Sequence, residues 1–118
     1  MKLFDYLRNK RLARIARKSK NEIALWKAVQ KITDEAVLKE VALNASTHFV
    51  LRLAAVQKIT DAAVLKEAAL KDADRSVREE AVEKITDMAV LKEVALNDSD
   101  MYVRRTAKKR IDCLQQET

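Results

Sequence analysis

A sixteen-residue stretch occurs three times in this chain, and the repetition restricts the fold more than any other feature. The copies are AVQKITDEAVLKEVAL at 28–43, AVQKITDAAVLKEAAL at 55–70 and AVEKITDMAVLKEVAL at 81–96. Each later copy differs from the first at two of sixteen positions, and the KITD tetrapeptide recurs after 27 and then 26 residues. A fixed period of this length is typical of stacked repeats, in which each repeat contacts its neighbours.

Each period contains two amphipathic helical patterns separated by a polar turn. Asp61 is suited to cap the first helix and Asp74 the second, because a carboxylate accepts hydrogen bonds from the free amides of a first turn. The apolar arc of the first pattern consists of Val64, Leu65, Ala68 and Ala69. That of the second consists of Val77, Ala81, Val82 and Ile85, with Glu79, Glu80 and Glu83 opposite. Helices this short are unstable alone in water, so stacking on neighbouring repeats must stabilise them.

The composition agrees with a helical protein. Glycine and proline are absent, and charged residues make up 36% of the chain. The single cysteine, Cys113, cannot form an internal disulfide, which favours a reducing compartment. No apolar run has the length of a secretory signal or a membrane span. We therefore expect a soluble cytoplasmic protein.

The repeat template extends over nearly the whole chain. We expect one all-α domain, residues 1–118, whose four helix pairs span 8–33 (a degenerate repeat), 34–60, 61–86 and 87–118. One template position is Val29, Val56 and Val82 in the first three repeats, and Lys108 in the last. A lysine there predicts a polar cap at the C-terminal end, so the array is expected to be complete.

The turn and second helix of the later repeats resemble those of HEAT-like repeats, in particular the short bacterial and phycobilisome-lyase-type ones. The segments that carry the resemblance begin Asp72-Ala-Asp-Arg-Ser-Val-Arg78 and Asp98-Ser-Asp-Met-Tyr-Val-Arg104. The resemblance implies a right-handed α–α superhelix, or solenoid, with the second helices on its concave side. It also implies a ladder of hydrogen bonds between repeats, made by Asp72/Arg78 and Asp98/Arg104. The second repeat has Ser46 before Arg52, and the first has Ser19 and Leu25, where no rung is expected.

The copies differ most along the solvent-facing stripe of the second helix. In successive repeats this stripe is Trp26, Lys27 and Gln30; Leu53, Ala54 and Gln57; Glu79, Glu80 and Glu83; and Arg105, Thr106 and Lys109. Phe49 and Val50 extend its apolar half. The stripe predicts a groove for a protein or peptide, with Trp26 as anchor beside Phe49 and Leu53. Glu79, Glu83, Arg105 and Lys109 would then set charge selectivity. Two alternatives remain: the N-terminal helix buries the aromatic residues, or adjacent repeats pair the charges.

The net charge of +6 is concentrated at the N-terminal end, since residues 1–20 carry +7. A nucleic acid or other polyanion could contact a basic helix there, through Arg8, Lys10, Arg11, Arg14 and Arg17. A solvated cap on the first repeat is the alternative. Membrane-surface binding is disfavoured, because Arg8 and Arg11 interrupt the apolar arc.

The chain lacks the convergent groups that catalysis requires. The single histidine, His48, stands at an N-cap-like turn position, and Cys113 has no histidine near it in sequence. We expect no enzyme activity, no metal and no cofactor. The predicted function is a monomeric interaction or scaffold module that binds a protein or peptide. Polyanion contact through the N-terminal helix is the alternative, and the resemblance also leaves open a chromophore-lyase-like accessory role.

Overall fold

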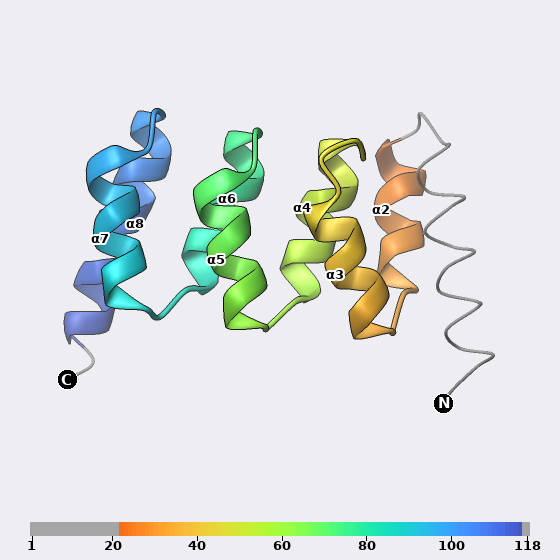
Figure 1. The fold of residues 1–118 in the computed structure, drawn as a ribbon, viewed down its shortest axis with the longest axis horizontal. Helices are drawn as coiled ribbons and strands as arrows, with labels where there is room; N and C mark the ends of the chain where they lie inside the picture. Colours follow the sequence, from red (N-terminus) through yellow and green to blue (C-terminus); the bar gives the residue numbers. More distant parts are fainter. Residues whose placement is uncertain (1–21, 117–118) are drawn as a thin grey trace. The chain divides into compact units, whose positions relative to one another are not determined.

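The computed structural model describes residues 22–116, which form seven helices and no strand (Figure 1). The expected all-α fold is confirmed for this part of the chain. The helices are α2 (Glu22–Gln30), α3 (Glu35–Leu43), α4 (Phe49–Lys58), α5 (Ala62–Lys71), α6 (Arg75–Lys84), α7 (Met88–Asn97) and α8 (Met101–Gln116). The helix expected in the first half of the degenerate repeat 8–33 lies outside the described residues. The chain divides into two compact units between Ile59 and Thr60.

Aspartates begin most of these helices, as the sequence predicts. Asp61 accepts hydrogen bonds from the amides of Ala63 (2.9 Å) and Val64 (3.1 Å) at the start of α5. The aspartate of each KITD motif acts in the same way, and the caps of α3, α5 and α7 are Asp34, Asp61 and Asp87. Asp74 caps α6. In α4 the cap is His48, whose Nδ1 accepts from the amide of Val50 at 3.1 Å.

Each unit has its own apolar core. In the first unit, α4 packs against both α2 and α3; in the second, α6 packs against α5 and α8, and α7 against α5 and α8. The predicted arcs of α5 and α6 are buried, and the residues are Val64, Leu65, Ala68, Ala69, Val77, Ala81, Val82 and Ile85. Val29, Val56 and Val82 are fully buried, whereas Lys108 is exposed. The last repeat therefore presents charge where the earlier ones present a core side chain.

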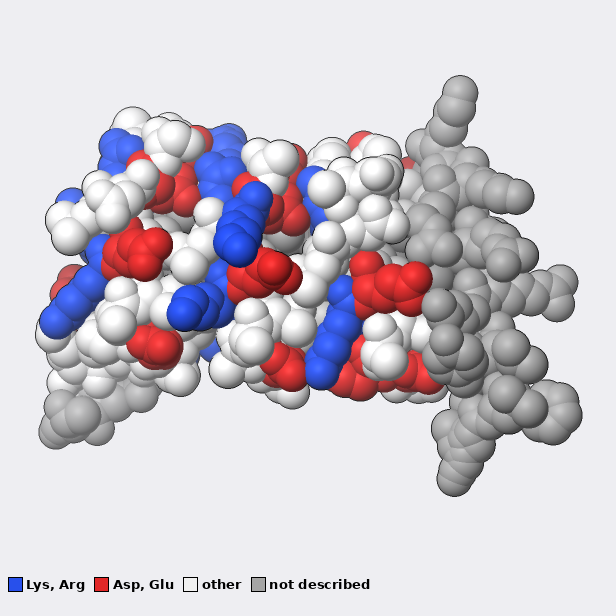
Figure 2. Space-filling model, viewed as in Figure 1, with Lys and Arg blue, Asp and Glu red and all other residues white. Residues whose placement is uncertain are grey.

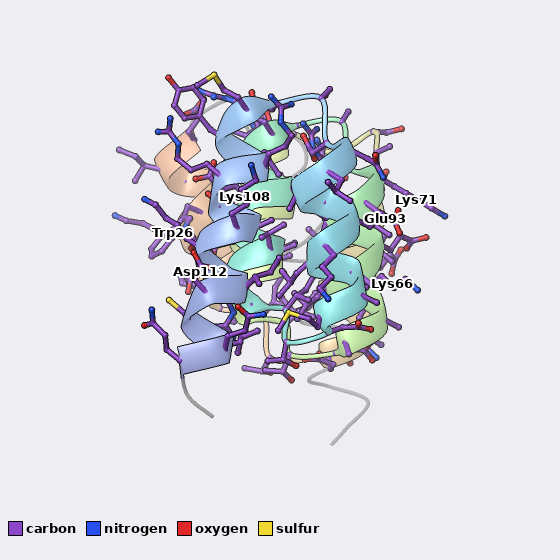
Figure 3. The ribbon with its side chains drawn as sticks, turned by 90° about the vertical axis from the view of Figure 1, so that its left-hand side faces the viewer. Trp26, Lys66, Lys71, Glu93, Lys108 and Asp112 are labelled. Carbon is purple, nitrogen blue, oxygen red and sulfur yellow. The ribbon has the colours of Figure 1, made fainter. Side chains whose placement is uncertain are left out.

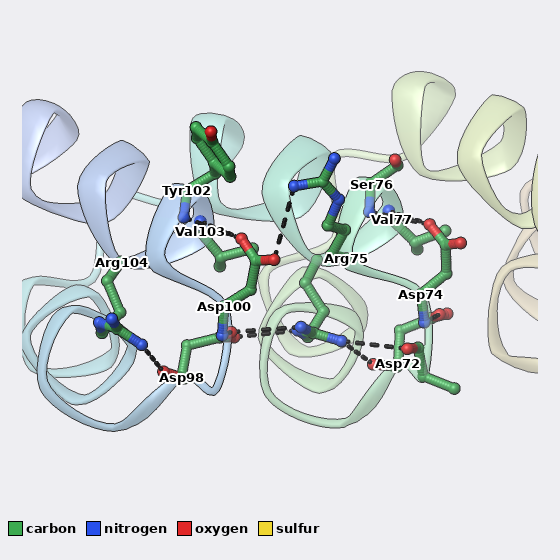
Figure 4. A network of polar contacts seen from close by, with 12 residues as sticks. Asp72, Asp74, Arg75, Ser76, Val77, Asp98, Asp100, Tyr102, Val103 and Arg104 are labelled. Carbon is green, nitrogen blue, oxygen red and sulfur yellow. Dashed lines mark hydrogen bonds and ion pairs between the residues drawn. The ribbon is translucent and has the colours of Figure 1, made fainter.

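A buried ion pair connects the two repeats of the second unit (Figure 4). Arg78 donates from Nε to Asp98 Oδ2 (2.9 Å) and from Nη2 to Oδ1 (3.2 Å), and the two side chains are only 12% and 7% exposed. Arg78 Nη1 also donates to the carbonyl oxygen of Asp72 at 2.9 Å, and Arg104 Nη1 to that of Asp98 at 2.7 Å. One inter-repeat contact of the expected Asp–Arg ladder, Arg78–Asp98, is thus present, and Arg78 and Arg104 each also bond to their own turn.

A second polar link, which the sequence analysis missed, joins the ends of neighbouring second helices. Lys58 Nζ donates to the carbonyl oxygens of Val29 (3.3 Å), Gln30 (2.9 Å) and Ile32 (2.5 Å), at the C-terminal end of α2. Carbonyls at the end of a helix lack intrahelical partners, although Val29 O also accepts from the amide of Ile32 at 3.0 Å. A cation near a helix C-terminus is favourable. In the second unit, Arg110 Nε donates to Ile85 O at 3.0 Å. The sequence contained evidence for this contact, because every KITD motif has a lysine at this position and the fourth repeat has Arg110 there.

Replacement of Lys58 tests this second link. We expect Lys58→Met to lower the free energy of unfolding by about 1–3 kcal/mol, because the half-buried carbonyls at the end of α2 lose a charged donor. Lys66→Met is the matched control, since Lys66 is exposed on α5, and its effect should stay within about 0.5 kcal/mol. Urea unfolding followed by circular dichroism measures both. Equal effects of the two substitutions would contradict the link.

A double-mutant cycle tests the Arg78–Asp98 pair. Arg78→Met and Asp98→Asn should show a coupling energy of about 1–3 kcal/mol, since the pair is bidentate and shielded from water. Asparagine retains the oxygen that accepts from the amide of Asp100. The Arg75–Asp100 pair is the control: its atoms are 3.5 Å apart and its side chains are 55% and 24% exposed. Its coupling should be below about 0.5 kcal/mol. Similar coupling energies for the two pairs would contradict the prediction that the Arg78–Asp98 pair contributes more to stability than an exposed ion pair.

Candidate functional site

In the first unit, the predicted anchor Trp26 lies on the solvent side of α2. Its side chain is 45% exposed, so it is not part of the core. Its indole Nε1–H donates to Gln57 Oε1 on α4 at 3.4 Å, a long hydrogen bond. The contact places the indole beside α4 and holds it only weakly. Within the described residues the ring is thus displayed rather than packed in the core, and the N-terminal helix of the alternative lies outside those residues.

Two apolar side chains lie about one helical turn from Trp26 or from its partner Gln57. Ile23, one turn before Trp26, is 67% exposed, and Leu53 on α4 is half-buried. We call the set Ile23, Trp26, Gln30, Leu53 and Gln57 the Trp26 surface. Phe49 lies at the start of α4, half-buried, with its ring stacked on His48 at a centroid distance of 5.0 Å. Lys27 is exposed.

Within this surface, the side-chain amide of Gln30 is incompletely hydrogen-bonded. Its Nε2 is buried and has no hydrogen-bond acceptor in the described chain. A buried donor without an acceptor destabilises the folded state. The copies share glutamine here, at Gln30 and Gln57, but only Gln57 is engaged by Trp26.

In the second unit, the predicted charges form two adjoining rows. The acidic row is Glu79 and Glu83 on α6, and the basic row is Arg105 and Lys109 on α8; the two helices pack together. No ion pair joins the rows in the described chain. Burial, followed by the charges of Glu80 and Glu79, raises the pKa of Glu83. The alternative in which adjacent repeats neutralise these charges is therefore not what the structure shows.

Arg105 turns instead toward Tyr102, a residue that the sequence analysis did not select. The guanidinium carbon of Arg105 lies 5.6 Å from the Tyr102 ring centroid, and that of Arg75 from α6 lies 5.2 Å away. Tyr102 is 49% exposed. The sequence feature that could have identified Tyr102 is the change from Ser76 in the preceding repeat to an aromatic residue at the equivalent position.

Asp100 holds Arg75 in this cluster, with 3.5 Å between Oδ2 and Nη1. Burial acts to raise the pKa of Asp100, but the amides of Val103 and Tyr102 and the charge of Arg75 outweigh it and lower the pKa. Asp100 therefore remains an anion while it caps α8.

The first-helix side of the second unit carries mixed charge and no comparable row. Figure 2 shows Lys/Arg and Asp/Glu interspersed on that side. In Figure 3, Lys66, Lys71 and Glu93 lie on the side of the unit opposite Lys108 and Asp112. A cavity of about 240 Å³ lies where α6 ends and α5 and α7 begin, lined by residues that include Leu65, Ile85 and Asp87. The carboxylate of Asp87 is already engaged in capping α7.

The remaining candidates are placed as follows. Arg8, Lys10, Arg11, Arg14 and Arg17, the predicted polyanion contact, lie outside the described residues. His48 Nδ1 is used as a helix cap, and Cys113 is exposed on α8. Among residues 22–116, no three His, Cys, Asp or Glu side chains gather closely enough to hold a metal. Within the same range, no helix combines the length and apolar character that a membrane crossing requires.

Comparison with protein families, curated proteins and solved structures finds no match for this chain.

The acidic row yields a prediction about pH. A carboxyl group whose pKa is raised by folding destabilises the folded state where it is ionised, and this cost disappears below the pKa of the unfolded chain, near 4.5. We expect Glu83→Gln to raise the free energy of unfolding at pH 7 by about 0.2–0.5 kcal/mol, the scale of like charges one helical turn apart. Near pH 3 the gain should vanish.

Urea unfolding at several pH values measures this effect. Glu67→Gln on α5 is the control, because Glu67 precedes Lys71 by one turn and its loss should bring no gain. A gain from Glu83→Gln that persisted at low pH would contradict the electrostatic explanation.

Proposed function

We propose that this chain is a non-catalytic interaction module that binds a protein or peptide on the exposed side of its second helices. The single observation that supports the proposal is that the Trp26 side chain is 45% exposed to solvent. On the same helix, Leu25 and Val29 are buried. Tryptophan is the residue most enriched at the energetic centres of protein interfaces, because it supplies a large apolar area and one hydrogen-bond donor.

The Trp26 surface has the chemistry of such a centre. Ile23 and Leu53 add apolar area on the same two helices, while Gln57 provides a polar group at the edge of the indole. Because the Trp26–Gln57 hydrogen bond is long, the indole N–H can donate to a carbonyl oxygen of the partner instead with little loss of free energy. Phe49 extends the apolar contact along α4, and the charged rows of the second unit would select among partners by charge.

We propose further that the helix pairs form a right-handed HEAT-like superhelix whose concave side carries these surfaces. The support is the Arg78–Asp98 link between consecutive repeats, which matches the ladder of that family. A cytoplasmic scaffold, assembled from repeats and acting without catalysis, is the setting in which such a module would work.

Selection from a displayed library of random peptides tests the proposal, with the full chain as bait at physiological ionic strength. Trp26 is the chain's one tryptophan, so its emission reports peptide binding to the wild type, and isothermal titration calorimetry measures the affinity of the wild type and of the variants alike. We expect enriched peptides to shift and protect the indole fluorescence. Trp26→Ala should weaken their binding by at least about tenfold, as for an interface hot spot.

Tyr102→Ala is the matched control, because Tyr102 is similarly exposed, at 49%, on a different helix. It should leave peptide affinity unchanged, and circular dichroism should show both variants folded. A selection without enriched peptides, or peptides that bind Trp26→Ala as tightly as the wild type, would refute the proposal.

A further inference from the structure

The acidic and basic rows of the second unit occupy equivalent places in consecutive repeats. Glu79 and Arg105 are 26 residues apart, as are Glu83 and Lys109, which is the length of this repeat. α6 and α8 run in the same direction (Figure 1) and begin after equivalent aspartate caps, Asp74 and Asp100. Glu79 therefore lies level with Arg105 along the two helices, and Glu83 level with Lys109.

The rows are level, but they are not paired with each other in the part of the chain that the structure describes. The described residues contain no ion pair between them, and Arg105 lies against Tyr102 instead. The pKa of Glu83 reflects its burial and the other glutamates of α6, as described above. Two parallel rows of opposite sign thus face solvent on one side of the unit, and neither neutralises the other.

We propose that this side of the unit is a self-association surface, on which α6 of one copy packs against α8 of a second copy. A two-fold axis parallel to the helices, placed between the facing surfaces, brings the acidic row of each copy against the basic row of the other. Because the axis is parallel to the helices, the rotation does not change a residue's position along the helix direction. Glu79 therefore meets Arg105 of the second copy, and Glu83 meets its Lys109. The interface is isologous, so each pair forms twice.

Charge complementarity favours a second copy over a polyanion. A nucleic acid presents one sign of charge, so the basic row would attract it and the acidic row would repel it. A second copy offers both signs in the matching order and spacing. The inference departs from the monomer expected from the sequence. Because it uses the charged rows between copies, charge selection of a peptide by these rows would belong to the monomer, whereas peptide binding at Trp26 belongs to the other unit and does not depend on it.

The strength of such a contact depends on salt. Exposed ion pairs contribute little individually, and they are screened as ionic strength rises. We therefore expect a dimer that forms at low ionic strength, about 0.01 M, where the Debye length is about 30 Å, and dissociates near 1 M, where it is about 3 Å.

Sedimentation equilibrium of the full chain tests the proposal, with charge-swapped variants. Glu79→Lys with Glu83→Lys makes both rows basic, and Arg105→Glu with Lys109→Glu makes both acidic. Each double variant alone should be monomeric at low ionic strength. An equimolar mixture of the two should restore a dimer of the wild-type mass, because each row again meets its opposite. All four positions are at the surface or half-buried, and circular dichroism checks that the variants fold.

Two controls separate this inference from others. Lys66→Glu with Lys92→Glu changes exposed charges on α5 and α7 and should leave the dimer intact. Trp26→Ala should also dimerise like the wild type, so the two proposals can fail separately. A wild-type chain that stays monomeric at low ionic strength would overturn the inference. So would a charge-swapped variant that dimerises alone, or a mixture that does not.

Discussion

Burial of the apolar arcs between neighbouring helices is the interaction on which everything else in this structure depends. α3 has nine residues and α4 to α7 have ten each, a length at which an isolated helix unravels in water. Each helix is stable because its arc, such as Val77, Ala81 and Val82 of α6, is removed from water by its neighbours. Most of the opposite arc lies outside that core and varies between repeats, but Ala54 of α4, which was expected on the solvent-facing stripe, is fully buried.

Polar links then determine how the repeats align. The bidentate Arg78–Asp98 pair and the Arg110–Ile85 contact join the second unit at both ends of α6 and α8, and Lys58 makes the equivalent contact in the first unit. Apolar packing alone is non-directional and tolerates sliding. These directional contacts hold equivalent residues level on successive second helices, so that single exposed side chains become ordered rows.

Much of the architecture could be predicted because it arises from local rules that each copy repeats. Asp61 and Asp74 as caps and the buried arcs of α5 and α6 were predicted from these rules, whereas the Arg78–Asp98 contact was expected only from the resemblance to HEAT-like repeats. The contact of Lys58 with the end of α2 was missed, since a lysine before an apolar residue is read locally as a solvated charge. Tyr102 was missed because its two arginine neighbours come from different helices, and one of them, Arg75, is 27 residues away.

The sequence by itself determined that the chain forms short paired helices, which side chains enter the core and where each helix begins. These properties depend on spacing within one repeat, and three near-identical copies specify them. Only the tertiary structure decided that, within residues 22–116, Trp26 is displayed and the charged rows on α6 and α8 do not pair with each other. Both outcomes depend on the distance and direction between side chains on different helices, and a periodic sequence does not encode those quantities locally.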